Sequence, residues 1–303
     1  MLGLNEINQW KTKGWVIIRN YVDVTKCVID MQNQYPVDAK NPIQDFGSAG
    51  HTNFPCQYKS INDMTVNIKL IKAVKQLLNT DDILLTQSVA WAKYCVKPKD
   101  ASSNHDQRIH MDYGNNYWTH PPKWDDVNMV AAIVYYSDTK KTGGATAVVS
   151  RNSKDDEVYR WPYIHMPGIA GKPFYNDKKT AEKSMNLFDR KLREKCYQRE
   201  ILPTLNKGDV LFYRMDLWHR GTPIKKNKVR YVHNLAWKKK SAEGICVWNK
   251  GWTQKMYYGW LENFIGKLNE EQRTTLGFPI LKSLSPDIRD AVLIRYPSLK
   301  SKL

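Results

Sequence analysis

The chain has 303 residues, of which 42% are hydrophobic and 25% are charged, with 16 Gly and 14 Pro. This composition is typical of a folded globular protein with a sizeable core, and it excludes collagen-like, coiled-coil and largely disordered chains. The formal net charge of +17 is the one outlier. It favours attraction to nucleic acid, acidic lipid or an anionic small molecule, but it does not define a chemistry.

Two classes of protein are disfavoured next. The longest apolar run, residues 129–136, is much shorter than the roughly 20 residues that cross a bilayer as a helix, so we expect no membrane-spanning segment. The amino terminus has neither the basic start nor the apolar stretch of a secretory signal, which favours a cytoplasmic location. The five cysteines contain no C-x-x-C pair, so no thiolate zinc site is predicted.

The front of the chain, about residues 1–80, is predicted to be a helical support. Apolar residues recur at helical spacing over 4–10, 25–35 and 66–78, and a short buried strand is predicted at 15–18. Residues 47–53 are predicted to form a loop.

The pattern of apolar residues changes at about residue 83. From there to about residue 240 the chain consists of short apolar runs separated by turn residues. They cover residues 83–96, 128–136, 145–149, 209–213 and 229–237, which is typical of a sheet-based sandwich or barrel. Residues 129–136 are apolar at every position, which predicts a central strand covered on both faces. Residues 154–200 are interpreted as an insertion over one end of the sheet.

The tail, about residues 250–303, is predicted to be a helical extension. One helix begins near Asn269, and another begins after Ser285 with Pro286 at its first position. No internal repeat or Gly/Ser linker divides the chain, so residues 1–303 are interpreted as a single domain.

His110-Met111-Asp112 is the first cluster with chemical meaning. In an extended chain, residues i and i+2 share a face and are able to bind one ion together. A second histidine, His219, follows the predicted strand 208–213. Two imidazoles and one carboxylate form the facial triad of non-haem Fe(II) oxygenases, which leaves positions for a bidentate 2-oxo acid and dioxygen.

Arg230 lies eleven residues after His219 and is the second residue of the run 229–237. We predict that residues 208–219 and this run form a hairpin, which would bring the guanidinium near the metal. The planar fork of arginine suits a bidentate carboxylate contact. His233 lies at an odd position of the same run and is predicted to point away from the metal.

These motifs resemble the phytanoyl-CoA dioxygenase family. The resemblance includes His110-x-Asp112, Gly143-Gly144, the run 208–212, His219-Arg220-Gly221-Thr222-Pro223 and Arg230, and it covers most of residues 4–237. It implies a mainly β fold with flanking α-helices around a double-stranded β-helix, also called a jelly roll or cupin-like core. It also implies Fe(II), 2-oxoglutarate and O2.

The resemblance further implies roles for particular residues. His110, Asp112 and His219 would be the catalytic iron ligands, Arg230 would anchor 2-oxoglutarate, and Thr222 would add a hydroxyl to the same carboxylate. Many relatives carry that hydroxyl one position earlier, where this chain has Gly221. Halogenating relatives have a small residue at the position of Asp112, so this carboxylate favours hydroxylation.

Several residues have a plainer interpretation. His105 is a rival ligand in a polar loop and is more simply a solvated histidine. Lys93 is more simply a surface lysine than a group that binds an anionic substrate. Trp118, Trp124, Trp161 and Tyr163 either cover the substrate or pack the insertion onto the barrel.

The sequence thus predicts a 2-oxoglutarate-dependent iron dioxygenase that hydroxylates an unactivated C–H bond of a small molecule. Two alternatives remain. The first is a hydroxylase of a macromolecule, which the charge of +17 also fits, with nucleic acid the less favoured partner. The second is a non-catalytic basic β-sandwich that only binds its partner.

Overall fold

A computed structural model describes residues 1–38, 51–95, 109–117, 123–160, 186–245 and 260–302 of the chain. Its strands are β1 (Trp15–Ile18), β2 (His51–Asn53), β3 (Ile83–Tyr94), β4 (Met129–Tyr135), β5 (Thr146–Val149), β6 (Glu200–Ile201), β7 (Val210–Tyr213), β8 (His219–Gly221) and β9 (Val229–Lys239). Its helices include α1 (Leu4–Lys13), α2 (Thr25–Gln34), α3 (Lys59–Thr65), α4 (Ile68–Leu78), α5 (Tyr113–Asn116), α6 (Thr139–Thr142), α8 (Leu187–Arg199), α9 (Trp260–Lys267), α10 (Glu270–Thr275) and α11 (Pro286–Arg295).

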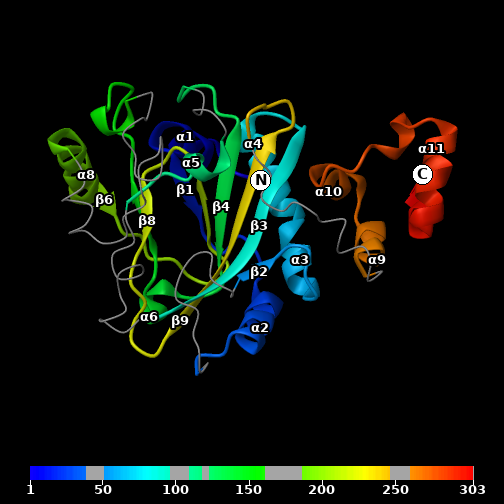
Figure 1. The fold of residues 1–303 in the computed structure, drawn as a ribbon, viewed down its shortest axis with the longest axis horizontal. Coiled ribbons are helices and arrows are strands. Elements are labelled where there is room, and N and C mark those ends of the chain that lie inside the picture. Colours follow the sequence, from blue (N-terminus) through cyan, green and yellow to red (C-terminus); the bar gives the residue numbers. More distant parts are fainter. Residues whose placement is uncertain (39–50, 96–108, 118–122, 161–185, 246–259, 303) are drawn as a thin grey trace.

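The strands form two facing sheets (Figure 1). The larger has six strands in the order β1-β7-β4-β9-β3-β2, and the smaller has three in the order β6-β5-β8. A bridge between His110 and His219 extends the smaller sheet. The chain crosses from one sheet to the other between β4 and β5, between β6 and β7, and on both sides of β8, as in a double-stranded β-helix. The predicted fold class is thus confirmed.

Alternation along the strands divides the core into two clusters on opposite faces of the larger sheet. In β4, Val130, Ala132 and Val134 pack with α1, α2, α3 and α4 in one cluster. Ala131 and Ile133 belong to the other, which fills the space between the two sheets. All seven residues of β4 are buried and the strand is flanked by β7 and β9, which confirms the predicted central strand.

Most predicted elements are present within a few residues of their expected bounds, but two predictions were wrong. Residues 51–53 form β2, which pairs with β3 at the edge of the sheet; three residues are too few to show a period. The predicted hairpin does not form, because β8 pairs with β5 while β9 pairs with β3 and β4. The turn after β8 therefore carries the chain between the sheets.

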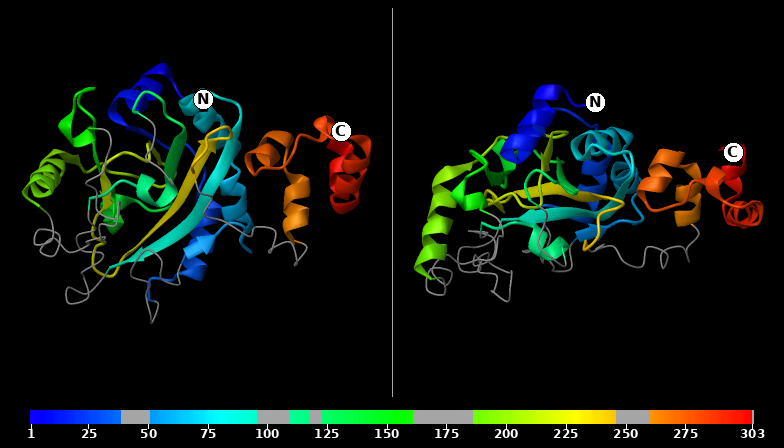
Figure 2. Two further views of the ribbon diagram at one scale, coloured as in Figure 1. Left: turned by 45° about the horizontal axis from the view of Figure 1, so that its top comes forward. Right: turned by 90° about the horizontal axis from the view of Figure 1, so that it is seen from above.

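The C-terminal helices form a small core of their own with Val66, and they lie on the side of the molecule opposite α8 (Figure 2). The helix α10 begins where predicted, since the Asn269 side chain accepts a hydrogen bond from the Gln272 amide at 2.9 Å. Helix α11 has Pro286 at its first turn, also as predicted. Among the described residues, no helix combines the length and the apolar character needed to cross a bilayer.

Candidate active site

Three side chains converge between the two sheets. Nε2 of His110 lies 3.3 Å from Oδ1 of Asp112, and Nε2 of His219 lies 3.3 Å from Oδ2 of the same carboxylate. The ligand atoms of all three residues lie within 4.8 Å of one another. The structure thus brings together the three residues that the sequence predicts as metal ligands.

The backbone positions the two histidines directly. The His110 amide donates to the His219 carbonyl and the His219 amide donates to the His110 carbonyl, each at 2.9 Å. Asp112 differs from the expected extended conformation, because it has φ −81° and ψ −12° and stands immediately before α5. The carboxylate therefore reaches the histidines from the start of a helical turn.

Further contacts orient the ligands. Nδ1 of His219 lies 2.9 Å from the Leu217 carbonyl, so that nitrogen is the donor and Nε2 keeps its lone pair for a metal. The Tyr213 hydroxyl donates to Oδ2 of Asp112 at 2.8 Å. Burial alone would raise the pKa of Asp112, yet His219 and His110 together hold that pKa well below its usual value. The carboxylate is therefore an anion, as a metal ligand must be.

Arg230 projects from β9 into the same interior and is 5% exposed. Its one hydrogen bond to the described residues runs from Nη1 to the Gly144 carbonyl at 2.7 Å, and its buried Nε has no partner. Burial lowers the pKa of Arg230, but a guanidinium remains protonated at neutral pH. No carboxylate of the described residues pairs with this buried cation, so it fits an anionic ligand.

Gly144 permits this position of Arg230. The residue has φ +75°, and a Cβ there would lie 2.2 Å from Cδ1 of Ile224 and 3.0 Å from Cδ of Arg230. Any side chain at this position would displace Ile224 and crowd the aliphatic part of Arg230. Gly143 is explained by the turn after β8, because a Cβ there would lie 2.7 Å from the Pro223 carbonyl oxygen and 3.0 Å from the Lys225 amide nitrogen.

Lys93 is buried at 7% exposure, so the surface interpretation was wrong. It faces Arg230 directly in the pairing of β3 with β9, and its Nζ lies 3.5 Å from the Thr222 carbonyl. The Thr222 hydroxyl donates to the Ala145 carbonyl at 2.7 Å. Two cations and one hydroxyl therefore gather at this end of the barrel.

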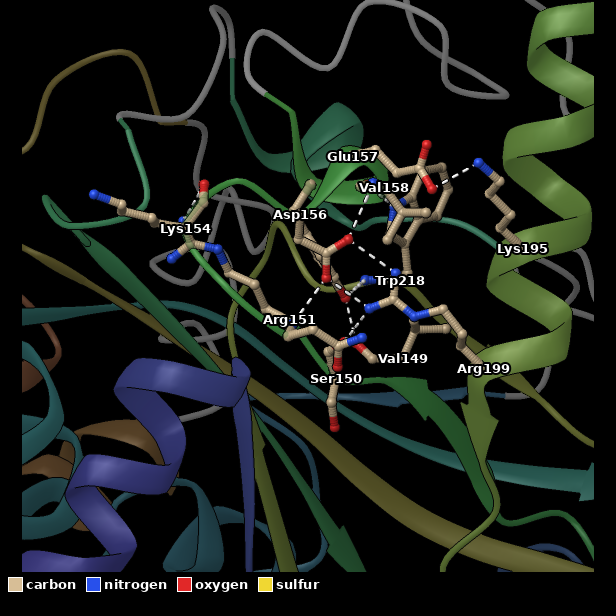
Figure 3. A network of polar contacts seen from close by, with 12 residues as sticks. Val149, Ser150, Arg151, Lys154, Asp156, Glu157, Val158, Lys195, Arg199 and Trp218 are labelled. Atoms are coloured by element: carbon tan, nitrogen blue, oxygen red, sulfur yellow. Dashed lines mark hydrogen bonds and ion pairs between the residues drawn. The ribbon is translucent and has the colours of Figure 1, made fainter.

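A polar network supports the strand that carries His219 (Figure 3). Trp218 donates from Nε1 to the Val158 carbonyl at 2.6 Å. Arg199, at the end of α8, forms hydrogen bonds to both oxygens of Asp156 at 2.8 and 2.6 Å and to the Ser150 carbonyl at 2.9 Å. The described part of the 154–200 segment thus fixes the residue next to the candidate metal ligand His219.

The remaining predicted residues divide into two groups. His233 points away from the metal ligands, as predicted, and its ring nitrogens lie 2.8 Å from the Ser88 hydroxyl and 2.9 Å from the Tyr136 hydroxyl. Trp124 is buried and stacks on Arg214, with Cζ 3.9 Å from its ring centroid, so it packs rather than covers a substrate. The other predictions, at His105, Trp118, Trp161 and Tyr163, lie outside the described residues.

Sequence reasoning missed Tyr213. The signal for it was alternation, because Leu211 and Tyr213 of β7 belong to the core between the sheets while Val210 and Phe212 belong to the opposite cluster. A tyrosine on the inward face, six residues before His219, was therefore a candidate contact for the site.

The donor set agrees with the cofactors that the sequence implies. Two imidazole nitrogens and one carboxylate are the ligands of a non-haem Fe(II) centre with open positions. The unpaired guanidinium of Arg230 suits a carboxylate of 2-oxoglutarate.

Solved structures share this fold. The carbocyclase SnoK of nogalamycin biosynthesis, described as non-heme and alpha-ketoglutarate dependent, gives a TM-score of 0.56 at 12% identity, over 84% of this chain and 90% of its own. EctD from S. alaskensis gives 0.53 at 12% identity over 81% of each chain. HygX from Streptomyces hygroscopicus, solved with nickel and 2-oxoglutarate, gives 0.51 at 15% identity over 80% of this chain and 90% of its own.

The comparison of sequences is more specific. A search of curated proteins found no match. The family model described as phytanoyl-CoA dioxygenase matches residues 31–232, about two thirds of the chain, and this range contains all five predicted site residues. The chain therefore belongs to the phytanoyl-CoA dioxygenase family, and it is a 2-oxoglutarate-dependent non-haem iron enzyme.

Proposed function

We propose that this enzyme hydroxylates an unactivated C–H bond of a small molecule. Iron, 2-oxoglutarate and O2 together supply the oxidising power, and the balanced products are succinate, CO2 and the hydroxylated substrate. The observation that carries the proposal is the convergence of His110, Asp112 and His219 in the same interior that holds the unpaired guanidinium of Arg230.

In this proposal the chain's own residues bind and orient. His110, Asp112 and His219 hold the metal through one atom each. Arg230 binds the distal carboxylate of 2-oxoglutarate with its free donors, and Lys93 adds a second positive charge to the same anion. Thr222 remains a candidate contact there, although its hydroxyl would first have to leave the Ala145 carbonyl.

The presence of Asp112 supports hydroxylation. As a third protein ligand beside His110 and His219, Asp112 would occupy the position that a halide would otherwise take. Tyr213 keeps Asp112 oriented for this role by donating to Oδ2.

A small-molecule substrate is supported by one structural neighbour, HygX, which has been solved with hygromycin B bound.

The test is succinate release from protein supplied with Fe(II), 2-oxoglutarate and O2 and a panel of small molecules. We expect release above the substrate-free level with the correct compound, and loss of that release in H219A and D112A. Turnover that persists in both variants would reject the assignment, because each removes a metal ligand.

A further inference from the structure

The pairing of the larger sheet sorts its inward side chains into rows, and these rows locate Asn234. Ala131 lies opposite both Tyr213 and Ala236, and Ile133 lies opposite both Leu211 and Asn234. The row of Asn234 is therefore next to the row of Tyr213, whose hydroxyl contacts Asp112. Asn234 alternates with the outward residues of β9, so its side chain faces the barrel interior.

The facing sheet gives the same position. Arg230 contacts Gly144, and Tyr135 contacts Thr146 with 2.8 Å between the two hydroxyl oxygens. Thr146 pairs with Gly221, and two residues further along β5 Val148 pairs with His219. On β5 the next inward positions after Gly144 are therefore Thr146, beside Tyr135, and Val148, opposite His219. On β9 the next inward positions after Arg230 are Val232, opposite Tyr135, and then Asn234. Asn234 and His219 thus lie at the same level of the barrel.

The carboxamide oxygen of Asn234, Oδ1, is buried and has no hydrogen-bond partner in the described part of the chain. By contrast, the buried Asn62 accepts from the Cys56 amide at 3.0 Å and donates to the Cys56 carbonyl at 2.6 Å. Buried polar groups without a partner are rare and disfavour the folded state, so an unpaired acceptor beside a metal site indicates a missing ligand.

We infer that Oδ1 of Asn234 accepts a hydrogen bond from a hydroxyl or amino group of the primary substrate. The co-substrate does not fit this oxygen, because 2-oxoglutarate at neutral pH is a dianion with acceptors and no donor. Asn234 would thus select substrates that carry a donor close to the carbon that reacts. This inference rests on the proposed function and adds a substrate class to it.

The first test concerns the unpaired oxygen itself and needs no substrate. N234L replaces the amide by an apolar group of similar size, so it is expected to raise the Tm of the metal-free protein by about 2 °C. The matched variant N62L removes a satisfied amide and is expected to lower Tm. A lower Tm for N234L would overturn the inference, because it would show that the protein already satisfies Asn234.

The second test concerns selectivity. The panel consists of polyols and amino sugars, each paired with its deoxy or O-methyl counterpart, and kcat/KM is measured from succinate release. We expect the wild type to prefer the donor-bearing member, N234L to lose this preference by about tenfold or more, and N234T, which keeps an acceptor oxygen, to retain part of it. An unchanged preference in N234L would overturn the inference.

A third measurement separates this inference from the proposed function. The Kd of 2-oxoglutarate, titrated anaerobically through the absorption of its Fe(II) complex, is expected to stay within about twofold of the wild type in N234L. A large rise would assign Asn234 to the co-substrate and overturn the inference while leaving the proposed function intact. Failure of the proposed function would instead appear as no succinate from the wild type with any compound, and the Tm comparison would still decide whether Asn234 lacks a partner.

Discussion

The Tyr213 hydroxyl donates a 2.8 Å hydrogen bond to Oδ2 of Asp112, the oxygen that also faces His219. Groups that orient metal ligands typically change metal affinity by 10- to 100-fold when they are removed. We therefore expect Y213F to raise the Kd for Fe(II) by about tenfold, as measured by anaerobic calorimetry. Y21F removes an exposed hydroxyl on the far side of the sheet and should leave this Kd unchanged.

A second prediction concerns the anion site. R230Q removes a buried cation with unused donors, so we expect the Kd of 2-oxoglutarate to rise by about 100-fold while Fe(II) still binds. T222V removes a hydroxyl that already donates to the Ala145 carbonyl, and its effect on this Kd should be smaller. The exposed Arg19 provides the control variant, R19Q. Equal Kd values for R230Q and R19Q would contradict the assignment of Arg230.

The network beside Trp218 gives a third prediction. R199Q leaves the buried Asp156 carboxylate without its cation, so it should lower the free energy of unfolding by about 2 kcal/mol, a value reduced because Arg199 is partly exposed. K195Q, in the same helix, breaks an exposed pair with Glu157 and should cost less than about 1 kcal/mol. Urea unfolding of the two variants measures the difference. Similar losses would show that the network does not hold the strand of His219.

His233 gives a prediction for pH. Burial lowers the pKa of this imidazole to about 3, compared with about 6.5 in the unfolded chain. Between these values the unfolded chain binds a proton that the folded chain does not, so acidification lowers the free energy of unfolding. The loss is about 2 kcal/mol between pH 7 and pH 5.

The variant H233Q isolates this contribution. Glutamine does not titrate and keeps groups that are able to bond with the Ser88 and Tyr136 hydroxyls. The variant should therefore show a flatter dependence of the free energy of unfolding on pH between 7 and 5, measured by urea titration. Parallel curves for the two proteins would mean that His233 is already protonated or accessible in the folded state.

The sequence was informative wherever a regular period or a dense motif was present. The helices α1 and α4 show apolar residues at helical spacing, and the strand β4 is a continuous apolar run. Local signals also placed the starts of α10 and α11, since the capping residue and Pro286 act within one turn. The three metal-binding candidates were recognised by their residue types and by their order in the chain. Recognising these two features does not require knowledge of the strand pairing.

Pairing between distant strands was not visible in the sequence. The hairpin failed because β8 has only three residues and its partner, β5, lies more than 70 residues earlier. Lys93 was misjudged for the same reason, because its burial follows from its position opposite Arg230 in the β3–β9 ladder. The positions of Asn234 and Tyr213 near the site follow only from the rows of side chains that run across paired strands.

The exchange of main-chain hydrogen bonds between His110 and His219 bears on which metal ion the enzyme takes up. These bonds fix the spacing of the two main-chain segments that carry the imidazoles. A set of two imidazoles and one carboxylate would also accept other divalent ions, and tighter binders than iron exist among them. The identity of the ion in the cell would then be set by supply, with iron retained only where it is the ion delivered.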